Sequence, residues 1–422
     1  MREALLPFLI RIAGAGAAFG LQVLLARLMS AEAYGGYVIA WSWILALGSV
    51  VSLGLSEAAM RILPRYQARG RHVQASVFFH RGMRLVAVAG LGLAGLGIML
   101  LHALPVTAPM LALLIVVAAG LPFIAMEYFL EGVARSLGWF RFISISVYVV
   151  RPVLIATACL ALHGLGVPLT LPVAGIVTIV CVAATGIAAY LRIAAHLPAV
   201  RSGPSRLSRL WLLAALPMLV VSGLEDILPA LDVMLVGALL GAEEAGIYFA
   251  AGRILALAHF AQYAVVFVSG RALSMALASP DRNAAQRRLQ EATATTFFAT
   301  LIAVVVTLIA GPILLSWFGE SFAAGFIPMC ILAAGLVARS LAVTCHEYLL
   351  LAGRHRPLIA INGLALMALA GSSFLLIPLF GLIGAAAASA LTMGLRSALL
   401  LRQVRQRGVH CGPGRKPLGQ SA

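Results

Sequence analysis

Two stretches of the sequence lie half a chain apart and read alike. Residues 30–40 read SAEAYGGYVIA, and residues 241–251 read GAEEAGIYFAA. Identical residues recur at an offset of 211, which is half of the 422-residue length. A shorter echo joins EYFL at 127–130 to EYLL at 347–350 at an offset of 220, which implies a small insertion in the second half. The sequence therefore predicts two copies of one structural unit.

The composition places these units in a membrane. Hydrophobic residues make up 62% of the chain, charged residues 10%, and the mean hydropathy is +1.03. A soluble domain needs more polar surface than this. Apolar runs of about 20 residues, each long enough to cross a bilayer, recur along the whole length. We expect an all-α polytopic protein of about twelve transmembrane helices, at 6–28, 37–60, 83–104, 109–131, 142–163, 168–191, 209–238, 246–269, 293–316, 325–350, 357–377 and 381–401.

Charge divides the predicted connections into two classes. One side carries basic clusters such as residues 61–71 and the tail 402–416, whereas the other side carries acids such as Glu32 and Glu243 and has no Lys or Arg. We expect a bacterial inner-membrane protein, and the positive-inside rule predicts that both of its termini lie in the cytoplasm. The net charge of +16 is accordingly read as a topology signal and not as a nucleic-acid site.

An even number of helices in each half makes both copies enter the membrane from the same side. The predicted repeats are therefore parallel, an arrangement that places a substrate site between the halves and permits alternating access. We expect an N-terminal six-helix lobe over 1–197, a cytoplasmic linker over 198–208, a C-terminal six-helix lobe over 209–402 and a basic cytoplasmic tail over 403–422.

Several of these segments also resemble a known family. Residues 24–35, LLARLMSAEAYG, look like the end of helix 1 in the polysaccharide flippase family (Wzx-type). Residues 54–56 followed by Arg61, and Asp232 followed by GIYFAAGR at 246–253, fit the same pattern. That family belongs to the MOP superfamily, which includes MATE-type multidrug exporters and lipid II flippases. The resemblance covers essentially the whole chain, although lipid II flippases usually carry two further helices.

The resemblance implies a transporter rather than an enzyme. Its expected substrate is a polyprenyl-pyrophosphate-linked oligosaccharide, made on the cytoplasmic face and flipped for O-antigen, exopolysaccharide or capsule synthesis. It further implies a cationic central cavity, coupling to an H⁺ or Na⁺ gradient, and work beside a polysaccharide polymerase or chain-length machinery. We expect no resident cofactor, and the charge distribution predicts no nucleic-acid partner.

Arginines at membrane depth are the candidate headgroup ligands, because a charge inside the bilayer is costly and usually functional. A guanidinium binds phosphate oxygens through two parallel hydrogen bonds and stays charged. The candidates are Arg151, Arg253, Arg339, Arg27 and Arg11. Arg11 and Arg27 lie near helix ends, where snorkelling is an alternative. For the other three, an interhelix ion pair is the competing interpretation.

Acidic residues form a second candidate set. Glu225, Asp226 and Asp232 fall in one predicted helix, where Glu225 and Asp232 share a face because they are seven residues apart. A buried carboxylate there can bind H⁺ or Na⁺ and couple transport to a gradient, or it can neutralise Arg253.

Further charges follow helical spacing near the predicted cytoplasmic ends. Glu127, Glu131 and Arg135 recur every four residues, and Glu57 and Arg61 make a similar pair. Structural or gating pairs are the favoured interpretation of both groups.

Two other functions stay open. A MATE-like exporter of cationic drugs would need acids, rather than arginines, to line the cavity. A membrane glycosyltransferase, polymerase or ligase is disfavoured because every predicted outward loop is about ten residues or shorter. The sequence has no Walker A motif and no CxxC, so we predict no catalytic residue, no metal site and no disulfide.

Overall fold

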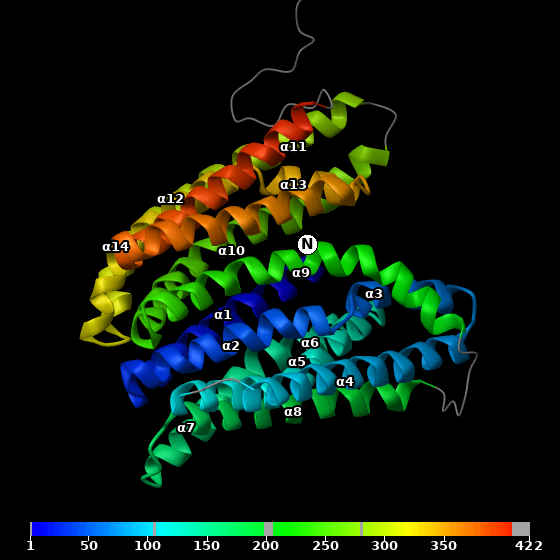
Figure 1. The fold of residues 1–422 in the computed structure, drawn as a ribbon. Helices are drawn as coiled ribbons and strands as arrows, with labels where there is room; N and C mark the ends of the chain where they lie inside the picture. Colours follow the sequence, from blue (N-terminus) through cyan, green and yellow to red (C-terminus); the bar gives the residue numbers. More distant parts are fainter. Residues whose placement is uncertain (1, 104–106, 198–205, 279–281, 407–422) are drawn as a thin grey trace, which may run out of the picture. The chain divides into compact units, whose positions relative to one another are not determined.

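The computed structural model describes residues 2–103, 107–197, 206–278 and 282–406, and helices account for nearly all of them (Figure 1). The predicted all-α fold is confirmed. The first half contains α1 (Arg2–Leu28), α2 (Ala31–Val51), α3 (Leu55–Ala68), α4 (His72–Ala103), α5 (Ala108–Ser136), α6 (Phe140–Ile145), the π-helix η1 (Ser146–Val150), α7 (Arg151–Gly164) and α8 (Leu171–His196).

The second half contains α9 (Arg206–Leu239), α10 (Ala242–Ala278), α11 (Arg282–Ser316), the 3₁₀-helix η2 (Glu320–Gly325), α12 (Phe326–Ser340), α13 (Val343–Leu351) and α14 (His355–Arg405). The long α14 bends at Gly381, where φ is 58° and ψ is −135°, so it makes two crossings. When α2–α3, α6–η1–α7 and η2–α12–α13 each count as one crossing, the described helices form the predicted two sets of six.

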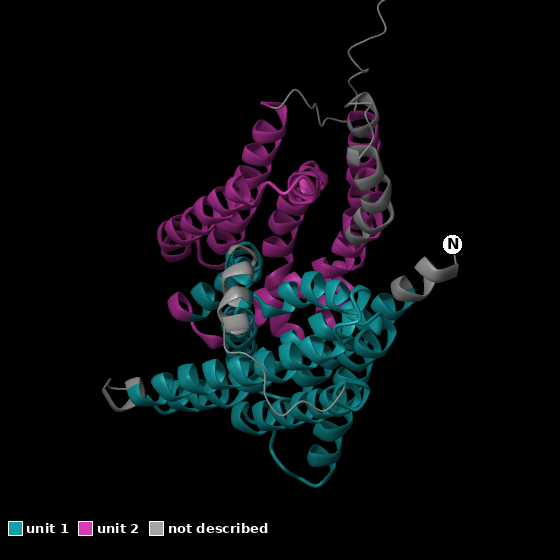
Figure 2. Cartoon of the chain, turned by 90° about the vertical axis from the view of Figure 1, so that its right-hand side faces the viewer, with its two compact units in different colours: residues 1–237 teal, residues 238–422 magenta. Residues whose placement is uncertain are grey.

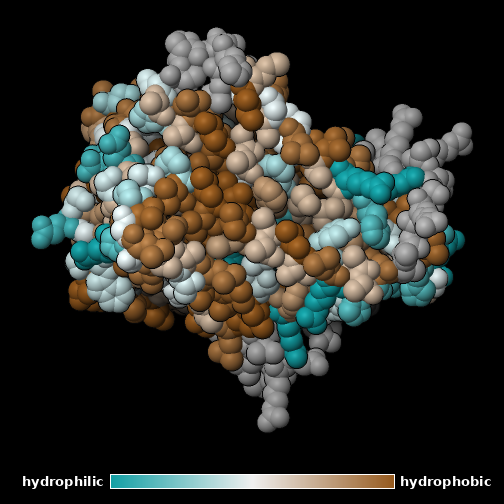
Figure 3. Space-filling view, turned by 90° about the horizontal axis from the view of Figure 1, so that it is seen from below, coloured by the Kyte–Doolittle hydropathy of each residue, from teal (hydrophilic) through white to brown (hydrophobic). Residues whose placement is uncertain are grey.

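The helices are apolar outside as well as inside. Nine helices among the described residues are long and apolar enough to span a membrane, judged by length and composition. Large apolar side chains stand exposed on α4 and α8, including Val88, Leu91, Val180 and Ile187. Figure 3 shows such side chains covering much of one face. Since apolar surface on this scale is stable only against lipid, the chain is a multi-pass membrane protein.

The chain divides into two compact units, residues 1–237 and 238–422 (Figure 2). Most of α9 therefore belongs to the first unit. Trp211 Nε1 on α9 donates a hydrogen bond of 3.1 Å to Tyr66 Oη on α3, and Ala46 of α2 packs with Met234 of α9. The lobes expected at 1–197 and 209–402 stay a prediction. Most of the expected linker, at 198–205, and the tail at 407–422 lie outside the described residues.

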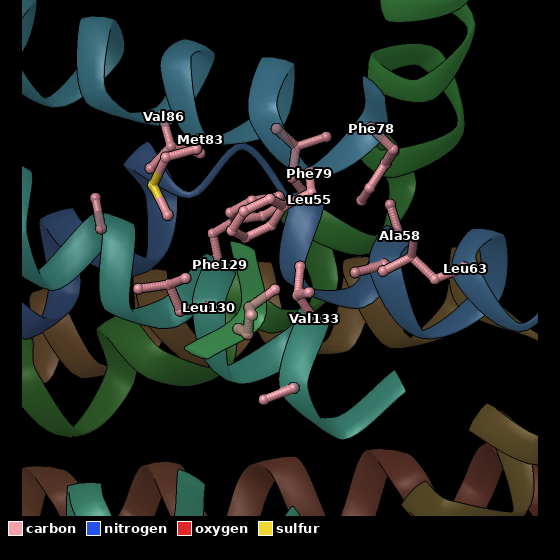
Figure 4. Packing of buried hydrophobic residues seen from close by; sticks show 14 of the residues in the cluster. Leu55, Ala58, Leu63, Phe78, Phe79, Met83, Val86, Phe129, Leu130 and Val133 are labelled. Atoms are coloured by element: carbon pink, nitrogen blue, oxygen red, sulfur yellow. The ribbon is translucent and has the colours of Figure 1, made fainter. Parts of the chain in front are cut away.

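A buried aromatic cluster holds α3, α4 and α5 together (Figure 4). Phe79 of α4 stacks on Phe129 of α5 with ring centroids 6.4 Å apart, and Phe78 meets Trp211 edge-on at 5.0 Å. Gly132 of α5 permits close approach of α3, since a Cβ there would lie 2.4 Å from the carbonyl oxygen of Ser56. This packing fixes the position of the acidic side chains on α3 and α5.

The predicted helix at 37–60 is broken in the structure. Leu53 and Gly54 adopt positive φ values of 56° and 64°, which end α2 and restart the chain as α3. Gly54 sits against α9, where a Cβ would approach the Ala215 carbonyl oxygen to 2.7 Å. A left-handed pair separates the two helical segments because neither residue can continue the right-handed hydrogen-bonding pattern.

One buried hydrogen bond recurs in both halves. Tyr37 Oη of α2 lies 3.1 Å from Thr178 Oγ1 of α8, and Tyr248 Oη of α10 donates to Ser389 Oγ of α14 at 3.2 Å. Both pairs are separated by 141 residues, so the offset of 211 applies to each partner. The internal repeat therefore extends from the matched sequence stretches to matched tertiary contacts.

The second sequence echo does not mark equivalent positions. After α5, Gly138 (φ 80°) donates to the Arg135 carbonyl, and after α13, Gly353 (φ 68°) donates to the Leu350 carbonyl. The following amides also bond to matching carbonyls, which is the Schellman pattern. The offset at this helix end is therefore 215, not the 220 of the EYFL echo. By this offset Glu347 corresponds to Gly132. The EYFL–EYLL echo is therefore a chance match, which Ala- and Leu-rich helices readily produce.

Candidate functional site

Arg151 is held by Glu127 within the first unit. Arg151 Nη1 donates hydrogen bonds of 2.6 and 2.5 Å to the two carboxylate oxygens of Glu127. The side chains are 13% and 7% exposed, and the Arg151 guanidinium carbon lies 6.0 Å from the ring centroid of Trp41. This pair joins α7 to α5. The interhelix ion pair is thus the arrangement that the structure provides for Arg151.

Glu131, one helical turn after Glu127 on α5, contacts a second group of side chains. Arg135 pairs with Glu131 on α5, and Tyr148 Oη donates to the same Glu131 oxygen at 3.1 Å. The Arg11 guanidinium carbon of α1 lies 4.9 Å from the Tyr148 ring centroid, within cation–π range. We call the set Arg11, Glu127, Glu131, Arg135, Tyr148 and Arg151 the polar junction.

Local backbone structure brings Tyr148 and Arg151 onto the same side. The π-helix η1 spans Ser146–Val150 and ends where α7 begins. A π-helical turn has more than the usual 3.6 residues, so it rotates the side chains that follow it. Gly14 lets α1 come close, because a Cβ there would lie 2.6 Å from Tyr148 Cβ. Tyr148 of η1 and Arg151 of α7 thereby contact Glu131 and Glu127 of α5, respectively.

An acidic group adjoins the polar junction. Asp226 of α9 is exposed and lies beside Ser49 of α2, whose hydroxyl donates to the Ala46 carbonyl at 3.1 Å. It also interacts electrostatically with Glu57 of α3 and Glu131 of α5. Of the three acids predicted on this helix, Asp226 and its neighbour Glu225 join this group. Excess negative charge around one exposed carboxylate favours a cation nearby.

Glu57 has charged neighbours on another helix, and its expected pairing with Arg61 stays a prediction. Glu57 interacts electrostatically with Arg135 and Glu131 across the α3–α5 contact, whereas Arg61 lies exposed on α3. The close approach at Gly132 brings Glu57 to α5. Arg27 is exposed in the last turn of α1, the position expected of a snorkelling arginine.

The second unit carries its own two candidate arginines. The Arg253 guanidinium carbon of α10 lies 4.4 Å from the Phe249 ring centroid, and both residues are partly shielded from solvent. Arg339 of α12 interacts electrostatically with His259 of α10. Gln262 Nε2, one turn beyond His259, donates 3.0 Å to the Leu336 carbonyl and ties α10 to α12. A continuous arginine ladder along one cavity stays a prediction.

Sequence reasoning missed Tyr148, Ser49 and Trp41. None of the three is charged, and the role of each follows from contacts with residues 17 or more positions away in the sequence. The signal that was available is the repeat of glutamates at 127 and 131, which requires partners when buried. Within the described part of the chain, no group of three or more His, Cys, Asp or Glu side chains is placed to hold a metal ion.

The family model described as "Polysaccharide biosynthesis protein" matches residues 1–269, well over half of the chain. The chain belongs to the polysaccharide biosynthesis protein family. No curated protein sequence matches it. The family resemblance read from residues 24–35 and their counterparts is therefore confirmed.

Solved structures share the fold at low sequence identity. An inward-facing multidrug resistance MATE family transporter of the MOP superfamily matches with a TM-score of 0.74 and 16% identity, over 96% of this chain and 98% of that chain. The lipid II flippase MurJ in an inward closed conformation matches with a TM-score of 0.77 and 15% identity, over 94% and 87%.

A third match is a MOP superfamily transporter from Pyrococcus furiosus, whose structure is described as having reversed binding-pocket polarity. It has a TM-score of 0.69 and 14% identity, over 96% of this chain and 95% of that chain. Together these likenesses establish the predicted MATE/MOP-like transporter fold of twelve helices for this member of the family.

Proposed function

We propose that this protein flips a polyprenyl-pyrophosphate-linked oligosaccharide from the cytoplasmic to the outer leaflet by alternating access. The family match over residues 1–269 carries the proposal, because it joins polysaccharide biosynthesis to a membrane-transporter fold. The product would supply O-antigen, exopolysaccharide or capsule synthesis, beside a polymerase or chain-length machinery. The protein would act as a transporter, not an enzyme, in a bacterial inner membrane with both termini cytoplasmic.

Electrostatics supports an anionic cargo. Moving a pyrophosphate through bare hydrocarbon has a Born cost on the order of tens of kcal/mol. Arginines at membrane depth reduce this cost when they face a hydrated path. Arg253 and Arg339 are the headgroup ligands that we favour, with Arg11 and Arg27 nearer the helix ends. Arg151 is less suited, because its guanidinium already serves the Glu127 carboxylate.

The acidic group suggests how transport is driven. Asp226 is exposed beside Ser49 and near Glu57 and Glu131, so it is the coupling residue that we favour for H⁺ or Na⁺. Glu225 and Asp232 on the same helix remain candidates. The same acids also favour a second function, export of cationic drugs, since an exposed carboxylate attracts cations.

One experiment separates the two functions. The gene is deleted in its native host, and polyprenyl-linked intermediates in the membrane are weighed by mass spectrometry. We expect a pyrophosphate-linked oligosaccharide to accumulate and to be cleared by wild type, but poorly by Arg253→Ala, Arg339→Ala or Asp226→Asn. Arg402→Ala, an exposed arginine near the end of α14, is the matched control and should clear the lipid. An unchanged lipid pool with raised sensitivity to cationic dyes would instead favour the exporter.

A further inference from the structure

A groove opens between α10 and α11 of the second unit, two helices that pack against each other. Its volume is about 450 Å³, within the range of about 300–1,000 Å³ that is usual for ligand sites. Ala264 and Val265 of α10 and Ala292 of α11 line it. Small apolar side chains on both helices leave the space between them unfilled.

Both hydroxyl groups in the groove walls already donate their hydrogen to a backbone carbonyl. Ser269 Oγ donates to the Val265 carbonyl at 2.6 Å, and Thr295 Oγ1 donates to the Glu291 carbonyl at 2.8 Å. Because each hydroxyl is bonded to its own helix, the groove presents mainly methyl and methylene groups. A polar ligand would find few hydrogen-bond partners in the groove, whereas a hydrocarbon chain needs none.

Charge lies at one end of the groove. Arg288 also lines it, and Arg288 Nη1 lies 3.0 Å from Glu291 Oε2, with the two side chains 60% and 63% exposed. The crossing predicted at 293–316 begins five residues after Arg288, so we expect Arg288 to lie near the lipid headgroups. An exposed ion pair of this kind contributes little to stability, and a phosphate can replace Glu291 as the partner of Arg288.

We propose that this groove binds an anionic bilayer phospholipid, with one acyl chain between α10 and α11 and its phosphate on Arg288. The apolar walls account for the chain, and the arginine at the membrane interface accounts for the anionic headgroup. The proposal goes beyond flipping and does not depend on it, because it concerns a resident lipid rather than the cargo.

Native mass spectrometry of the full-length protein tests the site. The purified protein is equilibrated with equal amounts of phosphatidylglycerol and phosphatidylethanolamine that carry the same acyl chains. We expect preferential retention of phosphatidylglycerol and a loss of about five-fold in its affinity for Arg288→Ala. Arg287→Ala is the matched control, since Arg287 is adjacent, exposed and not part of the groove lining, and it should bind like wild type.

Two further variants separate the headgroup from the chain. Glu291→Gln removes the competing carboxylate and should raise phosphatidylglycerol affinity, an effect that loss of a merely structural ion pair would not produce. Ala264→Leu fills the groove and should weaken both lipids alike, while Ala310→Leu on α11, outside the groove, should not. Thermal unfolding identifies any variant that fails to fold.

Other occupants would overturn the assignment. Equal effects of Arg288→Ala and Arg287→Ala, or no effect of Ala264→Leu, would remove the groove from consideration. Arg288-dependent binding of a polyprenyl pyrophosphate at higher affinity than phosphatidylglycerol would assign the groove to the cargo lipid instead. In either case the flipping assay described above is unaffected, so failure of this inference and failure of the proposed function are distinguishable.

Discussion

Arg151 donates two hydrogen bonds from one nitrogen to the carboxylate of Glu127, which lies 24 residues earlier on a different helix. Both charges are largely withdrawn from solvent. At membrane depth either charge would be energetically costly alone, so each side chain requires the other as its partner. Arg151, a candidate headgroup ligand by sequence, therefore also joins α7 to α5.

Removing either partner should therefore destabilise the first unit. We expect Arg151→Ala to lower the free energy of unfolding by about 3–5 kcal/mol, because Glu127 is left as an unpaired buried charge. Chemical or thermal unfolding in detergent measures the effect. The double variant Arg151→Ala, Glu127→Ala should recover much of the loss. Wild-type stability of Arg151→Ala with loss of transport would contradict a structural role and favour headgroup binding.

Tyr148 makes two contacts that two substitutions separate. Tyr148→Phe keeps the ring beside Arg11 but removes the hydrogen bond to Glu131, for an expected cost of about 1 kcal/mol. Tyr148→Leu also removes the cation–π contact and should cost about 0.5–1 kcal/mol more. Unfolding of the purified protein measures both. Tyr190→Phe, which keeps a ring stacked on Phe79, is the control and should change stability little.

Adding a side chain at Gly132 should destabilise the protein. Gly132→Ala places a methyl group against the Ser56 backbone, and we expect a loss of about 1–3 kcal/mol from overpacking. Gly95→Ala on α4 is the matched control, because nothing lies within 4 Å of a Cβ there. That variant should gain up to about 1 kcal/mol from helix propensity. Equal behaviour of the two alanines in an unfolding assay would refute the close α3–α5 contact.

The repeated hydroxyl pairs predict matched energetics in the two halves. Tyr37→Phe and Tyr248→Phe each remove one hydrogen bond from a tyrosine that is at most 3% exposed. Each should cost about 1 kcal/mol, and the two costs should be similar. Differential scanning fluorimetry of both variants provides the comparison. A large effect in one half with none in the other would contradict equivalent roles.

Much of the architecture was available in the sequence alone. The apolar runs fix the number of crossings, since each run must span the same thickness of hydrocarbon. The match of residues 30–40 to residues 241–251 predicts a repeat, which the Tyr37 and Tyr248 hydrogen bonds confirm. The family was also readable, because its helix-end motif is a local pattern. The glutamates at 127 and 131 could be singled out for the same reason, as helical spacing is local.

The tertiary structure decided which partner each charge has. Nothing in the local pattern connects Glu127 with Arg151, Tyr148 with Arg11, or Asp226 with Ser49, because these contacts depend on how closely helices approach and how each is rotated. The π-helix η1 sets the rotation of Tyr148 and Arg151, and Gly14 permits the close approach of α1 to Tyr148. The sequence by itself determined that the chain spans a membrane, that it contains a repeat and to which family it belongs. These features are local patterns, set by the thickness of the bilayer and the geometry of the helix. Packing, which acts between residues far apart in the chain, decided the rest.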